Sequence, residues 1–246
     1  MPARETEAII LKTFPLGEAD RLVSFFGRAS GRLRGVAAGA RRIKNRYGST
    51  LEVLSHVQMR YVERETRDLV RIQECELLES FHRAQSDYGL GTGLALISEI
   101  AERTLPEREV GEPMFRLLLF TAREVERRGS WELPLAYFAY WTVKLGGYLP
   151  PLDRCGACGQ ALGDRPGFHF GQSGGLYCEN CRKPGTRPVG KPGREWAGLF
   201  AAKRLDEIEY SPEAGKSLRE LREALLDWIE HQVERRLQTR EFLEST

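Results

Sequence analysis

The chain has 246 residues, of which 41% are hydrophobic and 29% are charged, and its formal net charge at pH 7 is +2. This balance excludes a disordered or fibrous chain, and the length allows one or two domains with a substantial core. No apolar run approaches the ~20 residues that span a bilayer, and the first residues lack the long apolar stretch of a secretory signal. We therefore expect a cytoplasmic protein.

Residues 1–80 carry the pattern of short strands joined by glycine-containing turns. Apolar or alternating runs lie at 8–11, 21–26, 32–37, 57–62 and 69–75. Five short strands in this length favour a small closed barrel, because closure removes exposed sheet edges. Periodicity alone leaves the order of the strands open.

Positive charge is concentrated in this β region. Residues 21–51 contain eight basic side chains and no acid, so the rest of the chain has 37 − 8 = 29 basic residues against 35 acidic ones. Such asymmetry is typical of a polyanion-binding face, and a merely solvated loop is the alternative. The polar loop 39–48 holds four cations that could neutralise successive phosphates: Arg41, Arg42, Lys44 and Arg46. Tyr47 in the same loop either stacks on a base or packs in the core.

From residue 81 the apolar period becomes helical. A clear stripe runs through residues 115–125, and residues 132–145 are apolar nearly all round, which predicts a central helix. Gly146-Gly147 and Pro150-Pro151 should end it. Helices resume at 194, and a long one is expected to begin near Ser211-Pro212, where serine can cap and proline fits the first turn. Its leucine stripe, which continues to Leu237, is core or a partner-helix contact.

Residues 153–193 are rich in Gly, Pro and Cys and need a stabilising cross-link, such as a metal site or disulfides, in order to fold. Two C-x-x-C pairs separated by nineteen residues have the spacing of a tetrahedral zinc site. The expected ligands are Cys155, Cys158, Cys178 and Cys181. Four thiolates fill the coordination sphere, so the site should be structural rather than catalytic. A redox pair or a disulfide is the weaker alternative, Cys75 is a bystander, and His169 is a possible spare ligand.

Several segments together closely resemble the RecO family of recombination and repair proteins. They are residues 7–12, 16–23, 31–37 and 39–42, the 146–150 turn and the 155–159 knuckle that follows. The resemblance covers about residues 5–182 and implies an α+β multidomain fold. Its expected parts are a five-stranded OB-type β-barrel (1–80), an all-helical domain (81–152 and 194–246) and an inserted four-cysteine zinc module (153–193).

The resemblance also implies a function. Family members bind single- and double-stranded DNA, anneal complementary strands, and with RecR help RecA displace single-strand binding protein, so the chain is expected to be nucleoid-associated. Carried over to this sequence, the DNA-facing candidates are Arg32, Arg34, Arg41, Arg42, Lys44 and Arg46. Basic residues of the insert could extend the DNA track or be solvated loop charges: Arg182, Lys183, Arg187, Lys191 and Arg194.

Three other classes of function stay open on the residues alone. An RNA-binding barrel fits the basic loop equally well, and a protein-interaction scaffold would make that loop incidental. An enzyme is disfavoured because no open metal site or nucleophile–base set is visible. The Gly215-Lys216-Ser217 segment is no phosphate-binding loop, since Tyr210 stands where the motif needs its first glycine.

Overall fold

The computed structural model of the chain describes residues 3–63, 68–169 and 174–243. Its N-terminal part is a closed barrel in the order β1-β2-β3-β5-β4, with β3 and β5 parallel and every other pair antiparallel. The closed five-stranded arrangement confirms the expected OB-type barrel and supplies the strand order that periodicity left open. The strands are β1 (Ala3–Leu16), β2 (Asp20–Gly27), β3 (Gly31–Ala37), β4 (His56–Val62) and β5 (Val70–Glu79).

The apolar run at residues 8–11 is continuous because both faces of β1 are buried there. Ala8 and Ile10 point into the barrel core. Ile9 and Leu11 belong instead to the core of the helical domain. Successive side chains of a strand alternate between faces, so a strand that has a core on each side must be apolar at every position.

The first helical part confirms the periodicity of the sequence. It contains α1 (His82–Gln85), α2 (Tyr88–Thr104), α3 (Glu112–Arg128) and α4 (Glu132–Leu145). The stripe of α3 is buried, and α4 lies centrally, in contact with α2, α3, α5 (Lys191–Ala202) and α6 (Gly215–Gln232). Helix α4 ends at Gly146-Gly147 as expected, and Gly147 takes φ +77°, a conformation that favours glycine.

The start of the long C-terminal helix was predicted wrongly. Ser211 makes no side-chain cap, and Pro212–Ala214 form a 3-10 turn in which the N–H of Ala214 donates to the carbonyl oxygen of Ser211 at 3.0 Å. Helix α6 therefore begins only at Gly215. Leu237 is buried but lies beyond the end of α6, before the short α7 (Arg240–Leu243), because the chain reverses near Glu234 at φ 53°.

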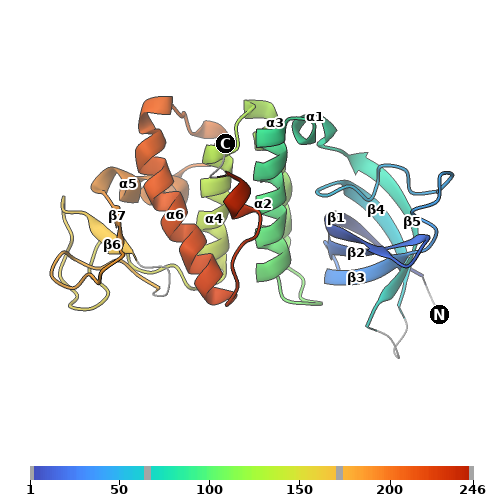
Figure 1. The fold of residues 1–246 in the computed structure, drawn as a ribbon, viewed down its shortest axis with the longest axis horizontal. Helices are drawn as coiled ribbons and strands as arrows, with labels where there is room; N and C mark the ends of the chain where they lie inside the picture. The colour runs from blue at the N-terminus through green and yellow to red at the C-terminus, as the bar shows by residue number, and fades with distance from the viewer. Residues whose placement is uncertain (1–2, 64–67, 170–173, 244–246) are drawn as a thin grey trace.

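The cysteine-rich insert leaves the helical domain after α4 and returns to it at α5. Its regular structure is one antiparallel pair, β6 (Gly167–His169) with β7 (Arg187–Val189). Figure 1 shows the barrel and this insert at opposite ends of the helical domain. Among the described residues, no helix has the length and apolarity to cross a membrane.

The barrel is fixed to the helices by a shared apolar core. Phe26 of β2 packs against Phe115 of α3 with ring centroids 5.7 Å apart, and the Ser98 hydroxyl of α2 donates to the Leu11 carbonyl at 2.8 Å. Gly31 lies so close to the segment before α3 that an added Cβ would be 2.5 Å from the backbone of Glu109. The outer face of β1, β2 and β3 is therefore partly covered by helices.

Candidate nucleic-acid interface and metal centre

The four expected cysteine ligands converge at one point of the insert. Their Sγ atoms all lie within 4.8 Å of one another, and those of Cys158 and Cys178 are 3.8 Å apart. A tetrahedral zinc ion with bonds of ~2.3 Å would hold its sulfur ligands ~3.8 Å apart. The donor set and the spacing therefore fit a metal ion of this kind.

Backbone hydrogen bonds shape both knuckles. The N–H of Gly159 donates to the Cys155 carbonyl at 2.9 Å, and that of Arg182 donates to the Cys178 carbonyl at 2.9 Å. Gly159 adopts φ +73°, which explains a glycine directly after the first pair. The two knuckles are joined because Gly156 donates to the Leu176 carbonyl at 2.8 Å.

The thiols of the cluster differ in their pKa values. Burial raises the pKa of Cys155, but the backbone N–H groups of Cys158, Cys178 and Ala157 outweigh it and lower that pKa to about 6. Contact with the sulfur atoms of Cys178 and Cys158 raises the pKa of Cys181 to about 12. Four thiolates at this distance would repel one another, so all four thiols could lose their protons together only with a cation to balance the charge.

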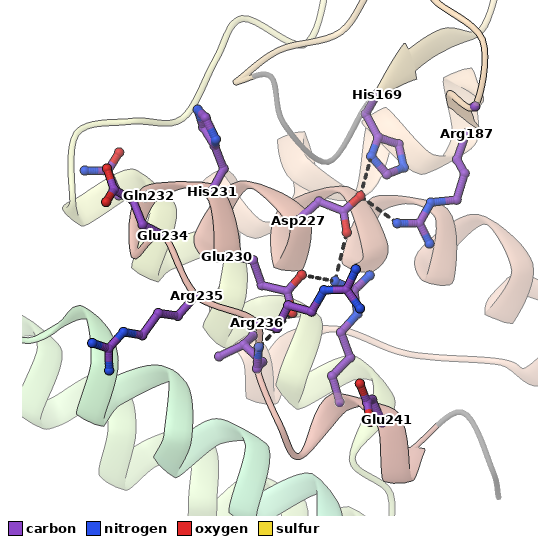
Figure 2. A pocket seen from close by; sticks show the side chains of 13 residues that line it. His169, Arg187, Asp227, Glu230, His231, Gln232, Glu234, Arg235, Arg236 and Glu241 are labelled. Carbon is purple, nitrogen blue, oxygen red and sulfur yellow. Dashed lines mark hydrogen bonds and ion pairs between the residues drawn. The ribbon is translucent and has the colours of Figure 1, made fainter.

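The insert is tied to the helical domain by a buried charge network (Figure 2). Asp227 of α6 lies 3.1 Å from His169 of β6, 2.6 Å from Arg187 of β7 and 2.8 Å from Arg240 of α7. Burial alone would raise the pKa of Asp227, but His169, Arg240 and Arg187 together lower it well below its usual value. His169 is thus a partner of Asp227 and is not part of the sulfur cluster.

The basic loop after β3 is anchored by its aromatic residue. Tyr47 is buried, belongs to the barrel core and donates its hydroxyl to the Ile72 carbonyl at 3.0 Å. The side chain of Asn45 accepts from the N–H groups of Tyr47 and Gly48, at 2.9 Å each. Tyr47 is therefore a core residue and not an exposed stacking ring. Its burial holds the preceding basic residues on the surface.

Four of the predicted cations are exposed on this loop with no acidic partner among the described residues. Arg41 donates to the Gly17 carbonyl at 2.6 Å, and Arg46 lies over the Tyr47 ring at 5.1 Å. Carbonyl and phenol groups leave these charges uncompensated. The exposed side chains of Arg42 and Lys44 have no hydrogen-bond or ion-pair partner in the described part of the chain. The loop therefore presents four unneutralised positive charges.

The other two predicted contact residues face the helical domain. Arg32 is only 15% exposed; it donates to the Leu105 carbonyl at 2.8 Å and lies within 3.6 Å of Glu102. Arg34 is half exposed and pairs with Glu107 at 2.8 Å. Both arginines help to join the barrel to α2 and the segment that follows it. The sequence offered no signal for this, because the partners lie about 70 residues further along the chain.

Four of the five candidate basic residues of the insert have local partners, whereas Lys183 is exposed and has none in the described part of the chain. Arg182 pairs with Glu179 at 2.7 Å and Lys191 with Asp164 at 2.7 Å. Arg194 donates to the backbone carbonyls of Leu152, Gly163 and Arg165, and Arg187 belongs to the Asp227 network. These contacts favour a structural role for these charges, at the far end of the molecule from the basic loop (Figure 1).

Comparisons with known proteins match nearly the whole chain. The family model "Recombination protein O N terminal" matches residues 1–81, and "Recombination protein O C terminal" matches residues 85–241. The DNA repair protein RecO of Koribacter versatilis is 35% identical over 236 residues, which cover 96% of each chain. That of Nocardioides sp. is 32% identical over 243 residues, covering 97% of this chain and 98% of its own. That of Syntrophobacter fumaroxidans is 40% identical over 163 residues, covering 66% and 64%.

Proposed function

The chain belongs to the RecO family, and from this membership we propose that it is a non-enzymatic, cytoplasmic mediator of recombinational DNA repair. It binds single- and double-stranded DNA and anneals complementary strands. With RecR it helps to load RecA onto DNA that single-strand binding protein covers. The observation that carries the proposal is a set of four exposed cations on the anchored loop that have no carboxylate partner among the described residues: Arg41, Arg42, Lys44 and Arg46.

The chemistry of annealing needs no ATP on this surface. Two DNA strands repel each other through their phosphates, and bound cations screen that repulsion. Base pairing then supplies the driving force. A surface of this kind contacts phosphates and not base edges, so it binds with little sequence preference. The buried anchor at Tyr47 keeps the loop in one place, which lowers the entropic cost of presenting a strand.

The cysteine cluster supports the second part of the proposal, a structural zinc ion. Cys155, Cys158, Cys178 and Cys181 would hold Zn²⁺ with all four coordination positions filled by protein sulfur. The role of this ion is to hold the fold of the insert, of which only a few apolar side chains, among them Leu162, Leu176 and Val189, join the core of the helical domain. The Asp227 network then fixes the insert to α6.

The test is annealing of complementary strands that are pre-coated with single-strand binding protein, without ATP. Wild type is compared with the variant R41Q/R42Q/K44Q/R46Q. A matched control removes four exposed cations outside the barrel, one from the insert and three from the helical domain, as K183Q/K203Q/K216Q/R219Q. We expect annealing by the wild type and by the control, and its loss in the loop variant, with both variants folded as measured by circular dichroism.

Each alternative class gives a different result. Equal loss in both quadruple variants would indicate a dependence on net charge alone, without a local site. DNA binding that survives in the loop variant would favour a protein-interaction scaffold. Stronger binding of RNA than of DNA of matched sequence would favour an RNA-binding module. A requirement for ATP, or a chemically altered DNA product, would indicate an enzyme.

A further inference from the structure

Two of the large apolar side chains that the barrel exposes lie next to cations in the sequence or in space. The first is Ile43, which stands between Arg42 and Lys44 in the loop and is fully exposed. Its neighbours Tyr47 and Leu51 are buried in the barrel core. The apolar surface of Ile43 is therefore in contact with water, and the side chains on either side of it are cations that suit a polyanion.

The second side chain is Phe14, near the end of β1, whose ring is 42% exposed. The ammonium group of Lys12 lies 4.9 Å from the ring centroid. Lys12 and Phe14 border a cleft of about 370 Å³, which Arg235 also lines. Among the described residues neither Lys12 nor Arg235 has an ion-pair partner, whereas the acids of the cleft are engaged: Glu99 with Arg103 and Glu102 with Ser24.

Hydrogen bonds join the segments that carry the two apolar groups. The backbone N–H of Arg41 donates to the Ala19 carbonyl at 2.9 Å, and its guanidinium donates to the Gly17 carbonyl at 2.6 Å. The basic loop is thereby attached to the β1–β2 turn, three residues from Phe14 and two from Ile43. With ~3.5 Å for each of these five residues and about 10 Å for the Arg41 side chain and its hydrogen bond, the Cα atoms of Phe14 and Ile43 lie within about 30 Å of each other. One single strand that covers an OB barrel can reach both, since such barrels occupy about 4–16 nucleotides.

We propose that Phe14 and Ile43 contact the unpaired bases of single-stranded DNA while the surrounding cations hold its phosphates. This inference rests on the proposed DNA-binding function and assigns to it a base-contacting site. The Phe14 ring offers a stacking platform, and Ile43 inserts against or between neighbouring bases. Base–aromatic stacking is tolerant of sequence because every base has a π-face.

The site distinguishes single strands from duplexes. In a duplex the base faces are already stacked on one another, so only phosphates and groove edges are available to the protein. Phosphate contacts therefore serve both forms of DNA. Contacts of Phe14 and Ile43 with base faces serve only the single strand, and they release no counterions.

The experiment measures binding of a labelled oligothymidine and of a duplex of equal length, by anisotropy at several salt concentrations. The variants are F14A and I43A, with L78A as a control on the same barrel, because Leu78 is 49% exposed on β5. We expect F14A to weaken single-strand binding about tenfold and I43A about fivefold. Duplex affinity and the slope of log affinity against log salt should stay as in the wild type. Phe14→Trp should restore binding.

The outcomes separate this inference from the function on which it rests. A wild type that fails to bind oligothymidine overturns both. Wild-type binding together with unchanged binding by F14A and I43A overturns only the base-contacting site. Equal losses on single strand and duplex also overturn it, because the effect would then not depend on unpaired bases. Since Ile43 is fully exposed, I43A tests the inference without a cost in folding.

Discussion

Neutralising Arg42 and Lys44 should change the salt dependence of DNA binding by a calculable amount. These two side chains are exposed and have no partner in the described part of the chain, so the variant R42Q/K44Q removes charge without breaking an internal contact. Each phosphate contact on single strands contributes about 0.7 to the negative slope of log affinity against log salt. The slope of the double variant should therefore be less negative than that of the wild type by about 1.4. When the salt concentration rises fourfold, the ratio of wild-type to variant affinity should then fall by about sevenfold.

Arg32 supplies the contrasting variant. It is the same type of side chain on the same barrel, but it is 15% exposed and engaged with the Leu105 carbonyl, Glu102 and Glu107. R32Q should lower the free energy of unfolding by about 1.5–3 kcal/mol, the usual contribution of a hydrogen bond to a charged group. Its salt slope should equal that of the wild type.

The assay is anisotropy of a labelled oligothymidine from low to high salt, with chemical denaturation of each variant measured in parallel. An unchanged slope for R42Q/K44Q would refute the argument that unneutralised loop charges contact phosphates. A less negative slope for R32Q in a protein that stays folded would indicate that Arg32 contacts DNA.

The remaining predictions concern the insert and the join between the domains. The variant C155S/C178S should contain no metal when it is measured by elemental analysis. Residues 153–193 should also lose protection from hydrogen exchange, while the barrel keeps its own, because metal binding energy at such sites is folding energy. D227N should destabilise the protein by about 1–3 kcal/mol, since it removes the buried carboxylate shared by His169, Arg187 and Arg240, although Arg240 keeps Glu223 and Glu230 as partners; unchanged stability in denaturant would contradict the network. Because the pKa of Asp227 is lowered from 3.8, its contribution is fully present above about pH 4 and is lost only as the pH falls further through the folded-state pKa; an acid titration of D227N against the wild type checks this. G31A should lower the melting temperature, because φ is +72° and the added Cβ meets the backbone of Glu109.

The local pattern of the sequence predicted the elements and the cluster of four cysteines well. Helix periodicity located α3 and α4, and the apolar runs located five strands, because both signals depend on which side chains a single element buries. The cysteine spacing predicted the cluster for a similar reason: two residues between thiols bring both to one side of a turn. The start of α6 was missed because a proline turn at Ser211 suits a 3-10 turn as well as a helix.

The assignment of charges and rings to surface or interior came only from the tertiary structure. In the sequence, Arg32, Arg34 and the four loop cations form one basic stretch, and Tyr47 stands beside them as an available ring. The fold divides this set, because acids and carbonyls about 70 residues away approach the two arginines and the barrel core encloses Tyr47. Burial and charge compensation depend on chain segments distant in sequence, and no local pattern records them. The exposed pair at Phe14 and Ile43 emerged in the same way, from apolar side chains that the fold leaves uncovered.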